Sequence, residues 1–546
     1  MSPASGAEAI FSRALACWLR HNPHEATTLG VRAHDGALPD ASPEGRLRER
    51  EEMSALRREV AAAPVVTGDD ALDRDAWDRA LDHTERVLER RGDAESLEPS
   101  LLPYAALAHQ ALRVVTPEHA AAFVSRMRAV PDYLAARTAE LSDGAARGRG
   151  LDRDVCDTFA EIVLPGAAAG MLRLAQIVAA RTGESDELVR AARLASDAYA
   201  AHAGVASGLR EHARPCVVLG EEEASWRLSV TMGLAGSPSG LVAEAREALR
   251  EARADVLHRA KALGARAARV EDVADLVAGL FARKVDAGVD LPALYRSHAA
   301  SALERLVDAG ALSPVVETNL GFEALPEGIA EGSQAVNWPA PLLDPDGRGH
   351  VAYAPSPSAH VAVACKSLAI HEAIPGHYLQ SRVWQLAHGH GRHAGRFIGV
   401  ADDVAIVRGY MGTMVAVEGW AVRAEQLARR VGVFDDEEEL FFAVCETIRA
   451  ARAVVDIELH VGEMTRDEAV RYTAWATLLP EAWARRQVVR YRRMPLQACT
   501  YWLGAREIER AASGHEGSMA AFHDALLARG PVPPRPDRGA GAHVSS

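Results

Sequence analysis

The segment CKSLAIHEAIPGHYLQ, residues 365–380, contains three side chains that could do chemistry together: His371, Glu372 and His377. Zinc hydrolases commonly place two histidines four positions apart in an HExxH helix, where the glutamate beside the first histidine works on a water molecule. In this chain the two histidines are six positions apart. At 100° per residue they would point about 120° apart around a regular helix, so a straight helix cannot direct both at one ion.

Pro375 and Gly376 lie between the two histidines and change this expectation. A proline at position 375 cannot donate to the carbonyl of His371, and its ring clashes with that carbonyl, so the helix must kink or bulge here. Glycine tolerates the dihedral angles of such a distortion. A bulge that absorbs two extra residues would return His377 to the face of an i+4 histidine. The alternative is a proline-broken helix with two unrelated histidines.

A third metal ligand is expected on a later helix, and the segment MVAVEGWAVRAEQLARR offers two carboxylates. Glu418 and Glu425 are seven positions apart, so both lie on one helical face. Glu418 stands in an apolar run, where a buried carboxylate is costly without a cation, and it is our first candidate for the ligand. Glu425 lies nearer the charged end, and we expect it to orient a ligand or to pair with an arginine.

The segment CETIRAARAVVDIELH predicts an apolar helix with one polar stripe, formed by Arg449, Arg452, Asp456 and His460. His460 could stabilise a tetrahedral intermediate or hold a substrate carboxylate, with Asp456 orienting it and one arginine as an anion clamp. The alternative is a structural network of arginine and aspartate that fixes helix packing.

Tyr501 follows a proline-marked helix start in MPLQACTYWLG and could donate a hydrogen bond to an oxyanion. A partly buried core tyrosine is the alternative interpretation. Arg490 and Tyr491 carry the same two interpretations, because each could contact substrate or only pack.

A large helical body must position these side chains, and the hydrophobic spacing predicts one. Apolar residues recur at three- and four-residue intervals in residues 72–92, 117–147, 152–182, 184–212 and 240–264. Between residues 313 and 359 Gly, Pro and Asn dominate, with short β-like pieces such as HVAYAP, which indicates a loop-rich layer with a small hairpin or sheet.

Helical periodicity returns at His360 and continues to about Leu527, with breaks near residues 388–396, 431–436, 462–466 and 494–496. The last stretch, GPVPPRPDRGAGAHVSS, is rich in Pro and Gly and has no apolar face. We therefore predict a mainly α-helical protein in four parts: an N-terminal helical region (1–312), a loop-rich layer (313–359), a C-terminal helical catalytic region (360–529) and a disordered tail (530–546).

Length and composition limit the possible functions. At 546 residues the chain exceeds a single core of about 250–300 residues, so it forms sub-domains or one large helical body. A net charge of −14 repels polyanions, which argues against nucleic acid or an anionic membrane as a partner. Six dispersed cysteines and the lack of a long apolar run favour a reduced, cytoplasmic setting without a membrane span.

Five segments resemble the bacterial domain-of-unknown-function 885 family, whose helical members are regarded as candidate zinc metallopeptidases. NPHEATTLGVRAHDGALPDAS is similar to its N-terminal signature, HEAIPGHYLQ to its HE..PGH motif and EGWAVRAEQL to its EGWALYAEQL segment. RAARAVVDIELH and RYRRMPLQACTYWLG resemble its RAARLVVDTGLH and RYIAWPGQALSYKIG stretches. These segments occur in order over most of the chain.

The resemblance implies a metal bound by His371, His377 and Glu418, with Glu372 as general base. It also implies a distant likeness to thimet-oligopeptidase-type and Taq-carboxypeptidase-type helical metallopeptidases, in which a deep channel holds the site. The chain departs from the family pattern at several positions, which we interpret as substrate-facing: Arg423 replaces a tyrosine, Ile457 and Glu458 replace Thr-Gly, and Leu496 replaces a glycine.

The sequence thus favours a zinc-dependent hydrolase of peptides or other small amides, with exopeptidase or dipeptidase character, in which Mn²⁺ or Co²⁺ could replace Zn²⁺. A rival hypothesis is a biosynthetic metalloenzyme that acts on a non-peptide amide, an N–N bond or an amino-acid conjugate. A metal-free binding protein on the same fold is a third hypothesis, and a structural protein is a fourth. A small molecule or short peptide is the expected partner, and the sequence is compatible with a monomer or an oligomer.

Overall fold

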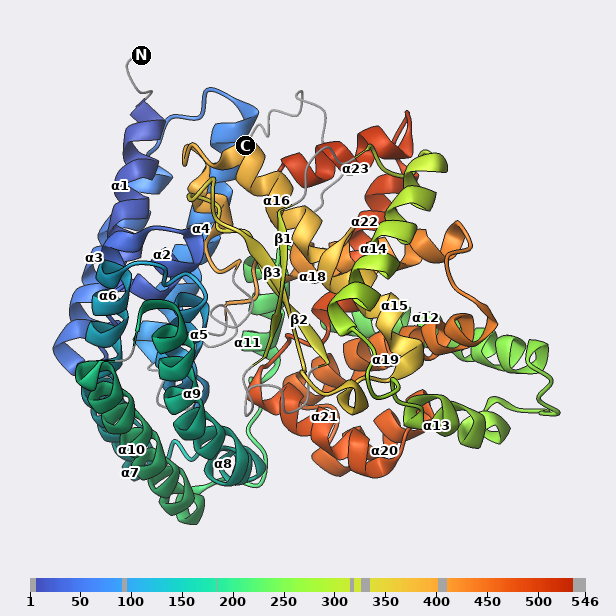
Figure 1. The fold of residues 1–546 in the computed structure, drawn as a ribbon, viewed down its shortest axis with the longest axis horizontal. Coiled ribbons are helices and arrows are strands. Elements are labelled where there is room, and N and C mark those ends of the chain that lie inside the picture. The colour runs from blue at the N-terminus through green and yellow to red at the C-terminus, as the bar shows by residue number, and fades with distance from the viewer. Residues whose placement is uncertain are drawn as a thin grey trace.

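The computed structural model describes residues 6–90, 96–183, 185–314, 319–325, 334–400 and 410–533. Within these residues the chain is mainly α-helical and contains one three-stranded sheet, which agrees with the predicted fold class. In Figure 1 the N-terminal helices lie on one side of the sheet, and most of the later helices lie on the other side.

The N-terminal helices form two groups. The first comprises α1 (Gly6–His21), α2 (Pro23–Leu29), α3 (Pro43–Ala61) and α4 (Gly68–Arg90). The second comprises α5 (Leu102–Ala111), α6 (Pro117–Arg128), α7 (Val130–Ala146), α8 (Arg153–Thr158), α9 (Leu164–Thr182) and α10 (Asp186–Leu209). Their starts follow local signals, because Ser42 and Thr116 each accept a backbone N–H of the first turn and each precedes a proline.

The second group has its own hydrophobic core, and the stretch 153–182 lies in it. By length and composition alone this stretch could cross a membrane. However, the side chains of Leu164, Met171, Leu174 and Val178 are buried against the neighbouring helices. Core helices of folded proteins also combine such length and hydropathy, so composition does not identify this stretch as a membrane span.

The middle of the chain contains four helices and the sheet. The helices are α11 (Glu221–Trp226), α12 (Pro238–Ala262), α13 (Ala274–Ala282) and α14 (Leu291–Asp308). The strands are β1 (Leu320–Ala324), β2 (Ala335–Trp338) and β3 (Gly349–Tyr353), in the order β1-β3-β2. Strand β3 pairs in parallel with β1, with Phe322 opposite Val351, and antiparallel with β2, with Asn337 opposite Val351.

The C-terminal helices end close to the predicted breaks. They are α15 (Cys365–Leu368), α16 (His377–His388), α18 (Met414–Arg430), α19 (Asp436–Val461), α20 (Arg466–Thr477), α21 (Glu481–Arg493), α22 (Thr500–Ser513) and α23 (Met519–Ala528). In helix α19 the ends are determined by neighbouring residues. A capping box of Asp435 and Glu438 begins the helix, and Gly462 in the left-handed conformation ends it.

One hydrophobic core joins the two ends of the chain. Trp18 and Trp77 from the first helices belong to the same buried cluster as Met414, Val454 and Leu503 from the last helices. Helix α12 packs along α19, and α18 packs along α22. The N-terminal region therefore supports the helices that carry the candidate site.

The predicted disordered tail begins too early. Residues 530–533 are buried, Val532 is only 4% exposed, and Gly530 donates its N–H to the carbonyl of Leu527. Burial of this apolar segment on the helical body outweighs its Pro and Gly content. Residues 534–546 lie outside the described residues.

Candidate metal centre

The chain between the two histidines leaves one helix and begins another. Residues Ala369–Ala373 form a π-helical turn, Ile374 is extended, and α16 begins at His377. Pro375 cannot continue a regular helix, because it lacks an N–H and crowds the preceding turn. The rings of His371 and His377 consequently come together with their centroids 4.8 Å apart. The helix breaks at Ile374 and Pro375 rather than bulging as the sequence predicts, and this break still brings the two histidines together.

Gly376 allows the two helical segments to approach this closely. Its N–H donates to the carbonyl of Ile370 at 2.9 Å. A Cβ atom at this position would lie 1.9 Å from the carbonyl oxygen of His371, which is far inside van der Waals contact. Only glycine fits between the π-helical turn and α16.

The sheet also packs against this turn. Ala335 and Val351 pack in one buried cluster with Ala373 and Tyr378. Asn337 of β2 donates its side-chain N–H to the backbone carbonyl of Glu372 at 3.0 Å. The small sheet thus holds the turn in place, and the predicted loop-rich layer lies beside the site.

Glu418 of α18 faces both histidines. Its Oε2 atom lies 3.6 Å from Nε2 of His371 and 3.6 Å from Nε2 of His377. The residue is 1% exposed, and this oxygen has no hydrogen-bond partner in the described part of the chain. Zinc–nitrogen and zinc–oxygen bonds of about 2.0–2.2 Å at tetrahedral angles place neighbouring ligand atoms roughly 3.3–3.6 Å apart. The three atoms therefore fit the ligand set of one metal ion.

Glu425 of α18 orients the first histidine. One oxygen of its carboxylate accepts from Nδ1 of His371 at 2.7 Å and from Arg449 at 2.5 Å, and the other accepts from the hydroxyl of Ser367. A proton on Nδ1 leaves the Nε2 lone pair directed at Glu418. Carboxylates commonly fix a metal-binding histidine in this way, so both roles expected for Glu425 occur together.

The charges of the site favour a cation at its centre. Burial lowers the pKa of His371, but its interactions with Glu418 and Glu425 outweigh burial and raise this pKa to about 10. Burial raises the pKa of Glu418, but the two histidines outweigh it and hold the pKa well below its usual range.

Glu372 lies at the edge of this group. Its side chain is half-buried, and burial raises the pKa of its carboxyl group above the ordinary value, against the opposing effect of His371 and His377. A carboxylate with a raised pKa beside the ligand atoms is a stronger proton acceptor than an ordinary glutamate.

Tyr501 of α22 lies over the other face of His371. The two rings are nearly parallel at 16°, with their centroids 6.3 Å apart. The guanidinium of Arg452 lies 5.4 Å from the centre of the Tyr501 ring. Arg490 of α21 reaches the Tyr501 hydroxyl at 3.4 Å and donates to Gln497 at 2.7 Å. The structure therefore brings these three predicted residues together at the candidate centre.

The surroundings of Arg449 and Tyr491 do not suit a role in substrate binding. Arg449 is 8% exposed, and it pairs with Glu425 at 2.5 Å and with Glu446 at 2.7 Å. Tyr491 is 1% exposed and belongs to a hydrophobic cluster between α19 and α21. Arg449 is thus occupied in holding Glu425, and Tyr491 packs in the core.

Asp456 and His460 are not brought to the centre. His460 follows Arg449 by about three helical turns, or about 16 Å along α19. Its Nε2 atom bonds to the backbone carbonyl of Tyr491 at 3.0 Å. Asp456 accepts the backbone N–H groups of Leu496 and Cys499, each at 3.0 Å. This end of the polar stripe fixes the loop between α21 and α22, which is the structural alternative for these two residues.

Helices α18 and α22 touch at two glycines, which sequence reasoning missed. A Cβ atom at Gly504 would lie 2.0 Å from the backbone oxygen of Val415, and one at Gly419 would lie 2.5 Å from the backbone of Gly504. Gly419 adjoins Glu418, and Gly504 is about one turn after Tyr501. Ser367 and Asn337 were missed as well, although Ser367 precedes His371 by one turn and so shares its helical face.

Residues 23–536 match the family described as bacterial protein of unknown function, DUF885. The chain belongs to this family. The DUF885 protein matches no curated protein.

Two solved structures share the fold of this DUF885 protein over nearly their whole length. A "putative lipoprotein" from Colwellia psychrerythraea is 17% identical with a TM-score of 0.75, and the match covers 97% of each chain. A "putative lipoprotein of unknown function" from Shewanella oneidensis is 19% identical with a TM-score of 0.72, and the match covers 96% of this chain and 98% of the other. At these identities the likeness concerns the fold alone.

The departures from the DUF885 pattern lie in packing positions, which corrects our interpretation of them as substrate-facing. Ile457 is fully buried in the shared hydrophobic core. Glu458 pairs with Arg246 of α12 at 2.8 Å. Arg423 is 1% exposed and pairs with Glu509 of α22. A helix position of this kind cannot be assigned to the core or to the site from its residue type alone.

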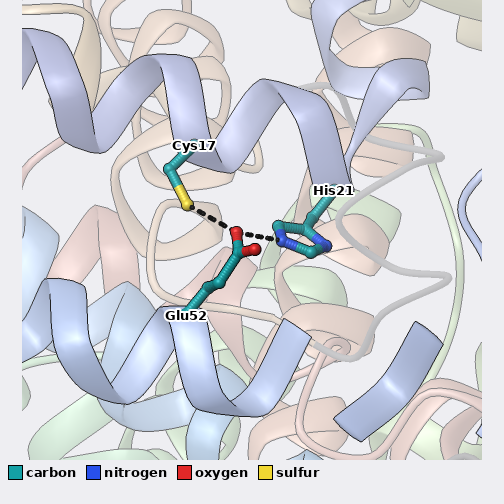
Figure 2. A group of neighbouring side chains, drawn as sticks. All are labelled: Cys17, His21 and Glu52. Carbon is teal, nitrogen blue, oxygen red and sulfur yellow. Dashed lines mark hydrogen bonds and ion pairs between the residues drawn. The ribbon is translucent and has the colours of Figure 1, made fainter. Parts of the chain in front are cut away.

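A second group of potential metal ligands lies in the first helices, far from the candidate centre in the sequence. Figure 2 shows Cys17 and His21 of α1 facing Glu52 of α3. Glu52 Oε2 accepts from the Cys17 thiol at 3.5 Å and lies 2.8 Å from Nε2 of His21. The guanidinium of Arg20 already donates to the same oxygen.

The electrostatics of this second group differ from those of the candidate centre. Burial and the neighbouring carboxylate raise the pKa of the Cys17 thiol to about 11. His21 and Arg20 outweigh the effect of burial and lower the pKa of Glu52 to about 2. The carboxylate charge is therefore already balanced by an arginine, and the three side chains are half-exposed. The buried group of His371, His377 and Glu418 has no such guanidinium on Glu418 in the described residues, and it fits a metal ion better.

Proposed function

We propose that this DUF885 protein is a zinc-dependent hydrolase that cleaves amide bonds in peptides or other small molecules. One observation carries the proposal: Nε2 of His371, Nε2 of His377 and the unpartnered Oε2 of Glu418 converge at ligand spacing in a buried site. Two nitrogens and one carboxylate oxygen form the ligand set of many catalytic zinc sites, with a fourth position open. Mn²⁺ or Co²⁺ would suit the same donors.

Zinc bound there would polarise a substrate carbonyl and lower the pKa of a water molecule to about 7. The Glu372 carboxylate would accept a proton from the attacking water and later deliver it to the leaving amine. Burial raises its pKa above the ordinary value, which makes the carboxylate a stronger proton acceptor. The Tyr501 hydroxyl would donate to the developing oxyanion, while Glu425 keeps His371 in the tautomer that binds the metal.

The rival biosynthetic reaction keeps the same metal and changes the substrate. The departures at Arg423, Ile457 and Glu458 and the loop layer of residues 313–359 motivate this hypothesis. The packing of the three residues removes only the first of these two grounds. The metal-free binding protein remains as the outcome to expect if no metal binds. A cytoplasmic location stays a prediction, and the lipoprotein descriptions of the two similar structures concern those proteins.

Elemental analysis of the protein purified without a histidine tag tests this proposal. We expect about one zinc per wild-type chain, and loss of this zinc in His377→Ala and in Glu418→Ala, with helix content retained by circular dichroism. His21→Ala, which alters the second group of ligands, is the matched control and should keep its zinc. Glu372→Gln should keep zinc but lose hydrolysis of a tripeptide library. Absence of bound metal after incubation with zinc would refute the hydrolase.

A further inference from the structure

Two arginines beside the candidate centre lack an acidic partner. Arg452 donates from Nη2 to Gln487 at 3.0 Å, and its buried Nε has no hydrogen-bond partner in the described residues. Arg490 donates to Gln497 and to Tyr501, which are both neutral. Neither guanidinium has a carboxylate within 4 Å among the described parts of the chain. Both side chains are half-buried, where an unbalanced positive charge is costly.

Arg449 and Arg126 show two ways in which this protein balances the charge of a buried arginine. Arg449 pairs with Glu425 and Glu446. Arg126 has no acidic partner but donates from Nε, Nη1 and Nη2 to four oxygen atoms, three of them backbone carbonyls. Arg452 and Arg490 have neither arrangement, and they are distinguished by their position beside Tyr501 and the histidine pair.

Both guanidinium groups lie close to Tyr501. The Tyr501 ring stacks on His371, Arg452 lies 5.4 Å from the ring centre, and Arg490 lies 3.4 Å from the hydroxyl. The two charges come from different helices, α19 and α21, and approach the same ring. They are thus one aromatic ring away from the metal ligand His371.

We propose that Arg452 and Arg490 form an anion subsite that binds a free carboxylate of the substrate. The proposal rests on the proposed function and names its substrate class: short peptides or N-acyl amino acids with a free C-terminal carboxylate. A guanidinium offers a planar pair of N–H donors that matches the two oxygens of a carboxylate. Because one residue extends a chain by about 3.5 Å at most, the carboxylate would lie one or two residues beyond the cleaved amide. Internal bonds of long chains would place no charge there.

Hydrolysis of matched tripeptides tests this subsite. The zinc-loaded protein is given a library of tripeptides with free C-terminal carboxylates and the same library as C-terminal amides. We expect the free acids to be cleaved at least tenfold faster. Arg490→Gln should raise KM for the acids by about 10- to 100-fold, the range of a hydrogen bond to a charged group, and should thereby abolish the preference for acids over amides. Arg490→Lys should recover part of this loss, and Arg486→Gln, an exposed position on the same helix, should have no effect.

A binding measurement separates failure of this proposal from failure of the hydrolase. The zinc-loaded Glu372→Gln variant is titrated by calorimetry with Ala-Ala-Ala and with Ala-Ala-Ala amide. Preferential binding of the acid that is lost on adding Arg490→Gln supports the subsite even if no peptide is cleaved. Equal binding of acid and amide, or no binding of either, overturns the subsite, whether or not the wild-type protein hydrolyses peptides.

Discussion

Gly419 and Gly504 bring helices α18 and α22 into backbone contact beside the candidate metal centre. The Cα atom of Gly504 lies 2.6 Å from the position that a Cβ on Gly419 would occupy. This approach fixes the distance between Glu418, which faces the histidines, and Tyr501, which stacks on one of them. The glycine pair therefore sets the width of the site without contacting any ligand atom.

Gly504→Ala should separate these helices. The added methyl group would lie 2.0 Å from the backbone oxygen of Val415, so α22 must shift. We expect a loss of at least about 2 kcal/mol of unfolding free energy and weaker zinc binding. Urea unfolding and zinc titration measure these effects. Gly514→Ala at the end of the same helix is the control, because its methyl group would meet only one atom, at 3.8 Å. Equal effects of both variants would contradict this account.

Glu425→Gln should weaken metal binding without removing a ligand. The amide can no longer act as a charged acceptor for Nδ1 of His371, and it leaves Arg449 with one acidic partner. Loss of such a partner lowers metal affinity by about 10- to 100-fold. Competition with a chelator measures the zinc Kd. Ser367→Ala removes only the hydroxyl donor to the same carboxylate and should have a smaller effect; a larger one would argue against this role of Glu425.

Much of the fold could be predicted because its signals are local. Ser237 before Pro238 marks the start of α12, and Gly462 marks the end of α19. Pro375 and Gly376 predict the distortion between the histidines, and an isolated carboxylate in an apolar run points to Glu418. Each of these inferences needs only the physical chemistry of a few neighbouring residues.

The rest of the fold and of the site depends on contacts between residues that are far apart in the chain. A single sequence does not predict such contacts. Nothing near Tyr501 indicates that its ring lies on His371, and nothing near Gly504 indicates contact with Gly419. The polar stripe on α19 illustrates the limit. Its residues share a helical face, yet Arg449 lies at the candidate centre and His460 lies about three turns away.

Leu496 should show the cost of a left-handed backbone. It has a φ angle of 66° and is fully buried, at a position where the family segment that it resembles has glycine. Truncation to alanine should cost about 2–4 kcal/mol for lost packing. We expect Leu496→Gly to be no less stable than Leu496→Ala, because glycine accepts this conformation without a steric penalty.

Leu503, which is buried in the same cluster but in the helix α22, is the matched control for this comparison. In a helix interior glycine is about 1 kcal/mol less favourable than alanine. Leu503→Gly should therefore be less stable than Leu503→Ala, in the opposite order to position 496. The same order at both positions, measured by urea unfolding, would exclude backbone strain at Leu496.

Acidification should destabilise the protein partly through His202. Burial and the nearby charge of Arg137 lower its pKa to about 4, and its two nitrogens contact Thr138 and Ser100. An unfolded histidine has a pKa near 6.5, so between pH 6.5 and 4 the unfolded chain binds a proton that the folded chain does not. Stability therefore falls as the pH falls through this window, by about 3 kcal/mol at pH 4 for this residue.

His202→Gln should remove this share of the pH dependence. The variant is expected to be less stable than wild type at pH 7, because it loses packing and hydrogen bonds, but to lose less further stability between pH 7 and 4.5. Unfolding midpoints in urea at both pH values measure the difference. His258→Gln, which changes an exposed histidine of α12, should follow the wild-type pH dependence. If His202→Gln also follows it, the buried ring takes up its proton in the folded protein as readily as in the unfolded chain.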